Sequence, residues 1–390
     1  MLTFPIGTQR RYAVASTIAA AALTLAACSD GTEAPEASQA PSTPGATEAM
    51  APDSALAEFM KPRDAYPIPA DTIDASSLTG ETVYYIPITQ QSPQFAVTGP
   101  QLTEALESVG INVQTCNGQA NPTEITKCIT QAVNAGAIGI VADAISYAMV
   151  STSFDDARAA GVPVIIGNQV PYPEAPADET LAYVEGGGSE MSTILLEWAA
   201  EDAGADADIL INQSMDGMTP GLYIADATEA LAAACPECIT TVNEVSSANF
   251  DLIPSSTSAA LLKDPDIGYV FSQFAQYLQP TAQGVETAGK TSSVVGMTGS
   301  VQLGGLQALE AGGFLQVASG QASAFHGWVY ADAAMRLALG MELPEYEVPV
   351  RLFTADTMAD VDLSQEGEAS GAWYGPVTFK DDFKALWGAQ

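Results

Sequence analysis

Beyond residue 80 the chain alternates between short apolar runs and stretches with the spacing of an amphipathic helix. The run "VYYIPI" at 83–88 is typical of a strand buried on both faces of a sheet. The helical spacing i, i+3, i+4 and i+7 follows at Leu102, Ala105, Leu106 and Val109. Strand-like and helical stretches then continue at 111–115, 125–136, 137–142, 151–160 and 162–167. This order predicts a parallel sheet that is covered by helices on both faces.

A second series of the same kind starts after the glycine run at 186–188. A helix is expected at 190–203, and strand-like runs stand at 207–212, 239–245, 268–273, 292–297 and 314–319. The last expected elements are a helix at about 326–339 and a strand at 348–353. The pattern therefore predicts an α/β protein with two doubly wound parallel-sheet lobes. About 310 residues follow position 79, which exceeds what one hydrophobic core usually serves and also favours two lobes.

The first 80 residues follow a different pattern. Arg10 and Arg11 precede an uncharged stretch of small and apolar residues at 12–27, which predicts a signal peptide at 1–27. The sequence "LAAC" resembles the bacterial lipoprotein motif, so Cys28 is the expected lipidation site. Residues 28–79 are rich in Ser, Thr, Pro, Ala and Glu, and we expect a disordered tether there. The arginine pair leaves the export route open.

The charge of the chain limits its partners. The sequence holds 47 acidic and 12 basic residues, for a formal charge of −35, and removing the leader takes away two more basic residues. Such a surface repels phosphate backbones, which excludes nucleic acid as a partner. We expect contact with the membrane only through the lipid on Cys28, at the outer face of the cell membrane.

The four cysteines after Cys28 are even in number, which indicates two disulfide bonds in an exported protein. Three connectivities are possible. We favour Cys116 with Cys128 and Cys235 with Cys238, because these pairs are the closest in sequence. A redox or zinc role for the second pair is the alternative, but a second such pair and nearby histidines are missing from the sequence.

The sequence argues against an enzyme. Its single histidine, His326, must serve any Ser-His-Asp triad, and a two-histidine metal site is excluded. The motifs GxSxG, HExxH and GxGxxG do not occur in the sequence, and we expect no phosphate-binding loop. We therefore expect no catalytic residue, no metal and no cofactor, and we interpret the glycine run at 186–188 as part of a hinge.

Several phrases together resemble the periplasmic sugar-binding proteins of ABC importers, of the ribose-binding type. They include "SPQFAVTGPQLTEALESVGINV", "NGQANPTEITKCITQAVNAGAIGIVADA", "ARAAGVPVIIGNQ", "TAGKTSSVVGM" and "LALGMELP". The resemblance covers about 80–354. It implies a type I periplasmic binding protein fold with a three-segment hinge, which closes over a solute at the carboxyl ends of the strands.

The resemblance also implies the lobe boundaries. The chain is expected to cross between lobes near 183–186, 319–322 and 351–354. The first lobe would then comprise 80–184 with 321–352, and the second lobe 185–320 with 353–390. The role of 355–390 stays open.

The solute contacts that the resemblance implies fall on polar and aromatic positions. In the first lobe they are Ser92, Gln94, Phe95, Asp143, Tyr147, Asn168 and Gln169. In the second lobe they are Phe250, Phe274, Gln276 and Thr298, with Ser319 near the second crossing. The charged contacts of the family fall on neutral or apolar residues here, such as the amides of Asn168 and Gln169. Alternatively, Asp143 caps a helix and the phenylalanines pack in the core.

Aromatic faces and amides suit a neutral solute with an apolar face. We therefore expect an extracytoplasmic, monomeric solute-binding lipoprotein that captures a small neutral sugar and delivers it to an ABC transporter permease. A sensory protein that presents its ligand to a membrane receptor is an alternative with the same fold. Another alternative is a binding protein for a less polar, aromatic or polyol-like solute. The sequence does not name the solute.

Overall fold

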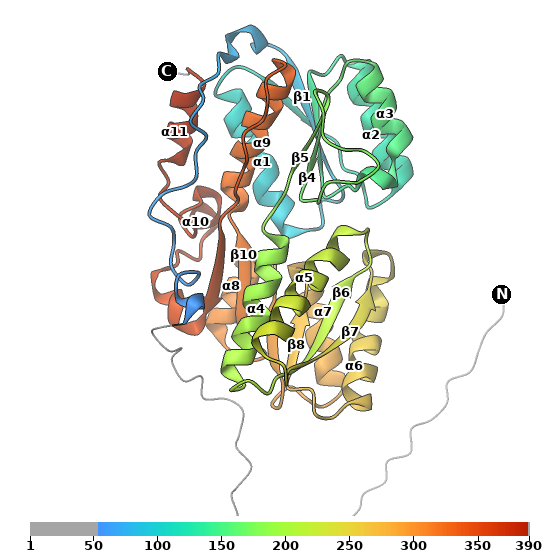
Figure 1. Ribbon diagram of the computed structural model, residues 1–390, viewed down its shortest axis with the longest axis vertical. Coiled ribbons are helices and arrows are strands. Elements are labelled where there is room, and N and C mark those ends of the chain that lie inside the picture. The colour runs from blue at the N-terminus through green and yellow to red at the C-terminus, as the bar shows by residue number, and fades with distance from the viewer. Residues whose placement is uncertain (1–53, 389–390) are drawn as a thin grey trace, which may run out of the picture. The chain divides into compact units, whose positions relative to one another are not determined.

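The computed structural model describes residues 54–388, which belong to one compact unit of the chain. The first lobe is built on a five-stranded parallel sheet of order β2-β1-β3-β4-β5. Its strands are β1 (Thr82–Pro87), β2 (Asn112–Thr115), β3 (Gly139–Asp143), β4 (Val164–Gly167) and β5 (Leu181–Val184). Its helices are α1 (Pro93–Glu107), α2 (Pro122–Asn134), α3 (Ser151–Ala159) and α9 (Ser323–Ala338). The pair α1 and α9 covers one face of the sheet, and α2 and α3 cover the other (Figure 1).

Local sequence explains how these helices form. Asn121 begins α2, because its side chain accepts a hydrogen bond of 2.8 Å from the amide of Thr123 and Pro122 occupies the first turn. The apolar stripe of α2, at Ile125, Cys128, Ile129 and Ala132, is buried against the sheet. The spacing in the sequence had predicted this stripe.

The second lobe is built on a six-stranded sheet of order β11-β10-β9-β8-β6-β7. Its strands are β6 (Asp208–Ser214), β7 (Ile239–Val245), β8 (Tyr269–Ser272), β9 (Val295–Thr298), β10 (Leu315–Gln321) and β11 (Val350–Thr354). Its helices are α4 (Gly188–Asp202), α5 (Thr219–Ala234), α6 (Ile253–Lys263), α7 (Leu278–Thr287) and α8 (Leu303–Ala311). The expected α/β class with two lobes is confirmed.

The third crossing lies earlier in the chain than expected. Strand β11 pairs antiparallel with β10 over its whole length, from Val350 opposite Gln321 to Thr354 opposite Val317. It therefore belongs to the second sheet, whereas the sequence analysis had put most of it in the first lobe. The chain crosses between the end of α9 and Val350. As an antiparallel edge strand, β11 pairs with the free backbone groups of β10, and it needs no crossover helix as a parallel strand would.

Residues 54–79 are packed against the body of the protein, which corrects the expected tether for this part of 28–79. We call this segment the strap. In Figure 1 it runs along both lobes beside α10 (Gln365–Ser370) and α11 (Phe379–Leu386). Leu56 is buried against α4 of the second lobe, while Tyr66, Ile73 and Leu78 join the core of the first lobe. A few well-spaced apolar residues thus anchor a segment whose composition is polar.

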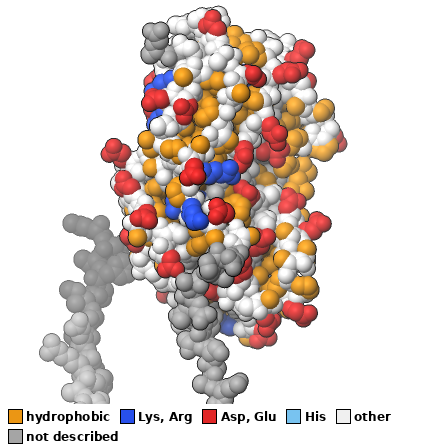
Figure 2. All heavy atoms as spheres, turned by 60° about the vertical axis from the view of Figure 1, so that its left-hand side comes forward, with side chains coloured by type: hydrophobic (Ala, Val, Ile, Leu, Met, Phe, Trp, Pro, Cys, Tyr) orange, Lys and Arg blue, Asp and Glu red, His pale blue; other side chains and the backbone are white. Residues whose placement is uncertain are grey.

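The strap is also hydrogen-bonded to the hinge and to the C-terminal segment. The amide of Leu352 in β11 donates to Phe59 O at 2.8 Å, and the amide of Arg63 donates to Tyr374 O at 2.9 Å. Tyr66 stacks on Phe325 of α9 with ring centroids 4.5 Å apart. Figure 2 shows this face of the molecule, with acidic side chains spread over it.

The C-terminal segment divides between the lobes, although the sequence analysis had put 353–390 in the second. Its first part, η6 (Ala355–Asp360), lies on α8, but α11 packs against α9 of the first lobe. The indole of Trp387 stacks on Trp328 of α9 with centroids 5.5 Å apart. Lys380 forms an ion pair of 2.8 Å with Glu104 of α1. Burial of its aromatic residues therefore returns the chain end to the first lobe.

Both expected disulfide bonds, Cys116–Cys128 and Cys235–Cys238, are present. Within residues 54–388, helices long and apolar enough to span a membrane are absent. The signal peptide at 1–27, the lipidation site Cys28 and the first part of the expected tether lie outside the described residues.

Candidate functional site

A cavity of about 310 Å³ lies between the two lobes, where strands of both sheets end. The first lobe contributes Ile88, Thr89, Ser92, Gln94, Phe95, Ala120, Ala144, Met149, Asn168 and Gln169. The second lobe contributes Gly188, Met191, Ser214, Met215, Asp216, Gly217, Thr219, Pro220, Tyr223, Ser247, Ala248, Phe274, Gln276, Tyr277 and Ser300. Gln321 completes the wall at the second crossing. The carboxyl ends of parallel strands are where open α/β sheets bind ligands.

Unusual backbone conformations shape the cavity wall. Ala120, Ala144, Asn168 and Ser300 all have positive φ angles, between 51° and 59°, and all four line the cavity. This left-handed conformation is uncommon for residues other than glycine and is found preferentially at functional sites. Ala144 and Asn168 directly follow β3 and β4, so the conformation turns the chain at the point where each strand meets the cavity.

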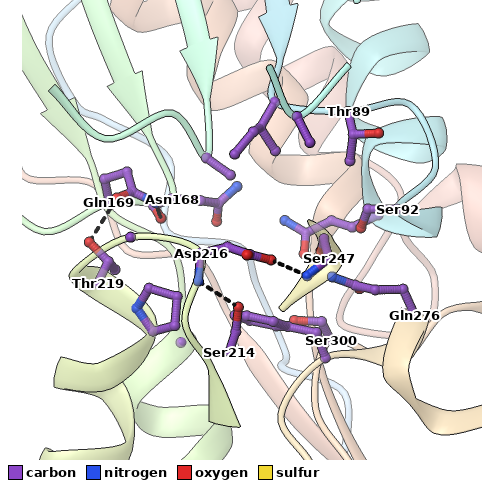
Figure 3. Close-up of a pocket in the computed structure, with 18 of the residues that line it drawn as sticks. Thr89, Ser92, Asn168, Gln169, Ser214, Asp216, Thr219, Ser247, Gln276 and Ser300 are labelled. Carbon is purple, nitrogen blue, oxygen red and sulfur yellow. Dashed lines mark hydrogen bonds between the residues drawn. The ribbon is translucent and has the colours of Figure 1, made fainter. Parts of the chain in front are cut away.

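On the second-lobe side, the carboxylate of Asp216 is held by three donors, of which Figure 3 shows Ser247. Its Oδ1 accepts from Ser246 Oγ at 2.7 Å, and its Oδ2 accepts from the amide of Ser247 at 2.9 Å and from Tyr277 OH at 2.8 Å. Burial disfavours the charge, but these hydrogen bonds outweigh burial and lower the pKa of Asp216 below its ordinary value. Asp216 is therefore an ionised acceptor at neutral pH.

On the first-lobe side, Asn168 is fixed by its neighbours. Its Oδ1 accepts from Gln321 Nε2 at 2.9 Å, and Gln321 Oε1 in turn accepts from the amide of Gly187 at 2.7 Å. Gly186 has no room for a side chain, because a methyl group there would overlap Asn168 Oδ1. The side-chain amides of Asn168 and Gln321 thus connect the cavity wall to the first two crossings between the lobes.

The two lobes contact each other directly beside the cavity. Thr219 of α5 donates to Gln169 Oε1 at 2.8 Å, as Figure 3 shows, and Tyr223 OH donates to Asn168 O at 3.4 Å. Gly188 leaves room for the Tyr223 ring. The lobes are therefore closed on this side of the cavity.

The electrostatics of the cavity are simple. Of the described residues that line it, Asp216 alone carries a charge at neutral pH, and lysine and arginine are absent from the lining. Groups of His, Cys, Asp or Glu that could hold a metal ion are not found in residues 54–388. The remaining surface combines amides and hydroxyls with Phe95, Phe274 and three methionines.

Seven of the residues expected to contact a solute line the cavity. They are Ser92, Gln94, Phe95, Asn168, Gln169, Phe274 and Gln276. Ser92 directly precedes helix α1, whose first turn presents Gln94 and Phe95. The short helix η5 (Ala275–Tyr277) follows Phe274 and carries Gln276.

Five expected residues lie elsewhere. Asp143 is fully buried behind Asn168 instead of lying at the rim, and Tyr147 belongs to a separate surface hollow, where Arg158 Nη1 donates to its hydroxyl. Phe250 is 39% exposed and leans on Tyr277 outside the lining. Thr298 is buried, and its hydroxyl donates to backbone oxygens. Its two acceptors are Ser272 O and Gly299 O.

The expected glutamine position was displaced by two residues. Ser319, where the resemblance put it, is buried and donates to Met191 O at 2.9 Å, whereas Gln321 lines the cavity. Side chains alternate between the two faces along β10, so Ser319 and Gln321 point to the same face of the sheet. Only Gln321, at the end of the strand, reaches the cavity. His326 also lies behind the wall, fully buried against Tyr330.

Sequence reasoning missed Asp216 and the methionines. Asp216 stands in the run "SMDGM" directly after β6, so its place at the carboxyl end of a strand was a usable signal. Met149 and Met191 carry no such signal, because methionine at helical spacing is typical of core packing.

Two doubly wound lobes that are joined by several crossings and enclose a cavity at their strand ends define a hinged solute-binding protein. The family model of the periplasmic binding protein domain matches residues 83–342. The chain belongs to this family. Its members are binding proteins, so the expectation that the chain is not an enzyme is confirmed.

Solved structures agree in fold. The 5-methylthioribose transporter solute-binding protein from Thermotoga lettingae is 14% identical with a TM-score of 0.66, over 83% of this chain and 100% of that one. A protein from Mycobacterium smegmatis in complex with β-D-fucofuranose is 16% identical with a TM-score of 0.65, over 75% and 98%. An Actinobacillus succinogenes ABC transporter solute-binding protein with bound D-allose is 15% identical with a TM-score of 0.63, over 72% and 99%. No curated protein matches the sequence.

Proposed function

We propose that the protein captures a small neutral sugar or sugar-like solute between its lobes and delivers it to an ABC transporter permease. The observation that carries this proposal is the interlobe cavity, whose lining joins many amides and hydroxyls to aromatic faces around a single ionised acceptor. Sugar rings present hydroxyls at their edges and C–H groups on their faces, which matches such a lining. A carboxylate without a nearby cation repels anionic solutes.

The solved neighbours support a sugar. The three solved structures named above hold 5-methylthioribose, β-D-fucofuranose and D-allose as bound solutes. We assign solute contact in this chain to the seven expected residues that line the cavity, together with Asp216 and Gln321. The protein acts as a monomer outside the cytoplasm, and the lipid on Cys28 anchors it to the outer face of the cell membrane.

Titration calorimetry of the mature protein tests the solute class. The panel comprises D-allose, 5-methylthioribose and the polyol allitol as neutral solutes, and D-glucuronate as an anionic sugar of similar size. We expect at least one neutral solute to bind with a dissociation constant in the micromolar range or below, and D-glucuronate not to bind. Tight binding of D-glucuronate would overturn the proposal. Replacing Cys28 by serine tests the anchor, since the protein should then leave the membrane fraction.

The apolar part of the lining favours a second candidate, a less polar solute. Met149, Met191 and Met215 join Phe95 and Phe274 around the cavity. Methionine and phenylalanine bind apolar groups without directional preference. Mass spectrometry of the solute that co-purifies from the native host separates this candidate from a fully hydroxylated sugar.

A further inference from the structure

A buried carboxylate stands directly behind the wall of the cavity. Asp143, the last residue of β3, is fully buried and accepts three hydrogen bonds. Its Oδ2 accepts from Tyr85 OH at 2.8 Å, and its Oδ1 accepts from Tyr330 OH at 2.9 Å and from Asn168 Nδ2 at 2.7 Å. All three donors are uncharged, so the site holds an acidic group without a neutralising cation. Burying such a group has a considerable free-energy cost, which hydrogen bonds offset only in part.

The surrounding backbone is built to admit these donors. Tyr85 comes from β1 and Tyr330 from α9, and both side chains are almost fully buried. Gly167 precedes Asn168, and a methyl group at Gly167 would overlap the hydroxyl of Tyr330. Helix α9, which reaches the first lobe only after the second crossing, therefore supplies one of the three donors through a gap that glycine leaves.

Asn168 connects this buried group to the cavity. Its side-chain nitrogen is held by Asp143, its side-chain oxygen by Gln321, and its backbone has a φ angle of 53°. An asparagine with free rotation would expose either the oxygen or the nitrogen to a solute. With an accepting oxygen of Asp143 on one side and the Gln321 donor on the other, only one orientation satisfies both neighbours.

We propose that Asp143 is a positioning residue for solute recognition, which acts through Asn168 by fixing the orientation of its amide in the cavity wall. This inference rests on the proposed function, because it takes Asn168 as a solute contact. Asp143 itself touches no solute. Its role is to make the Asn168 amide rigid before the solute arrives, so that orientation costs no free energy during binding.

The substitution Asp143→Asn tests this role. An amide at 143 has one acceptor oxygen in place of two, and its nitrogen needs one of the tyrosine hydroxyls to turn and accept. It therefore offers Asn168 at best a neutral hydrogen bond, which is weaker than one to a carboxylate. The control is Tyr85→Phe, which removes one donor to the same buried carboxylate without touching Asn168. The double variant D143N/N168D exchanges the two groups and restores a matched pair.

The first readout is the side-chain amide signal of Asn168 in nuclear magnetic resonance, identified by its loss in N168D. We expect a strongly downfield proton in the wild-type protein and in Y85F, and an ordinary shift in D143N. An unchanged signal in D143N would overturn the proposal. This readout needs no solute, so it decides whether Asp143 positions Asn168 even if the proposed function fails.

The second readout is the dissociation constant for D-allose and 5-methylthioribose. We expect D143N to weaken binding about tenfold or more, Y85F to change it by less than about threefold, and the double variant to recover part of the loss. Equal losses in D143N and Y85F at equal melting temperatures would assign Asp143 a structural role only. If neither sugar binds the wild-type protein, the proposed function fails, and the amide signal still decides the positioning.

Discussion

The hydroxyl of Thr219 in the second lobe donates a hydrogen bond of 2.8 Å to the side-chain oxygen of Gln169 in the first lobe. The amide nitrogen of the same Gln169 side chain donates to Asn168 O at 3.0 Å. Gln169 is 5% exposed, and each of its polar ends has one partner within the protein. It acts as a bridge between the lobes at the edge of the cavity.

This bridge predicts a change in the rate of solute release. Thr219→Val keeps the shape of the side chain but removes the donor, so the closed arrangement loses about 0.5–1.5 kcal/mol. We expect solute to dissociate several-fold faster, as measured by stopped-flow fluorescence. Thr219→Ser is the matched control because it retains the hydroxyl. Equal release rates in the two variants would contradict the bridging role.

Asp216 is expected to set both affinity and charge selectivity. Asp216→Asn leaves one of its donors, Ser246, Ser247 or Tyr277, facing an amide nitrogen, and it removes the negative charge of the lining. We predict that a neutral sugar binds at least tenfold more weakly and that the repulsion of D-glucuronate is relieved. Ser246→Ala is the control, since it removes one donor and keeps the charge. Equal dissociation constants in the two variants, measured by calorimetry for the neutral sugar and for D-glucuronate, would contradict this prediction.

The strap is expected to be part of the folded structure. Tyr66 is buried between Phe325 and Phe379, and its hydroxyl donates to Gly371 O at 2.7 Å. Tyr66→Ala should lower the free energy of unfolding by about 3–5 kcal/mol, because it leaves a cavity and an unpaired carbonyl. Lys61→Ala, at an exposed position of the same segment, should change it by less than about 0.5 kcal/mol. Denaturant unfolding of both variants provides the comparison, and equal midpoints would mean that the strap does not stabilise the fold.

The buried His326 should make stability depend on pH. Burial lowers the pKa of His326 from its ordinary value of 6.5 to about 3. Below pH 6.5 the unfolded chain takes up a proton that the folded chain does not. The contribution of His326 to the free energy of unfolding is therefore complete above pH 6.5. It is lost as the pH falls toward 3, by up to about 1.4 kcal/mol per pH unit.

The test compares the wild-type protein with His326→Asn, which removes this titration and keeps a polar side chain beside Gln321. Between pH 7 and pH 5 the wild-type protein should lose more stability than the variant, as measured by urea unfolding. Burial raises the pKa of Asp143 in both proteins, so any contribution of that group cancels in the difference. Parallel pH profiles would contradict this prediction, because they would mean that His326 takes up its proton equally in the folded and the unfolded protein.

The two disulfide bonds should differ in their effect on stability. Cys116 and Cys128 are separated by 12 positions, and Cys235 and Cys238 by 3. On the chain-entropy estimate, losing the first bond costs about 3 kcal/mol and losing the second about 2 kcal/mol. Paired serine variants, compared by denaturant unfolding, measure the two values. A larger loss for the second pair would show that native-state contacts, not loop entropy, dominate.

Part of the site could be predicted because strand ends are visible in the sequence. The family resemblance put Asn168 and Gln169 after the apolar run "VPVIIG" and Phe95 after the first strand, and all three line the cavity at the carboxyl ends of the strands. Asp143 also ends a strand, yet it points away from the cavity. The direction of a side chain at a strand end depends on the turn that follows, and no sequence pattern here signals the left-handed turn at Ala144.

By itself, the sequence determined the two α/β lobes and indicated the carboxyl ends of the strands as the place of the site. It favoured the disulfide pairs that the structure holds but left three connectivities possible. These features depend on local periodicity and on proximity along the chain, which a single sequence displays. Only the tertiary structure decided that β11 joins the second sheet, that 54–79 form a strap and that the chain end returns to α9. It also decided that Gln321 and not Ser319 reaches the cavity. These outcomes depend on which distant surfaces bury each other's apolar side chains, and that is fixed by packing in three dimensions.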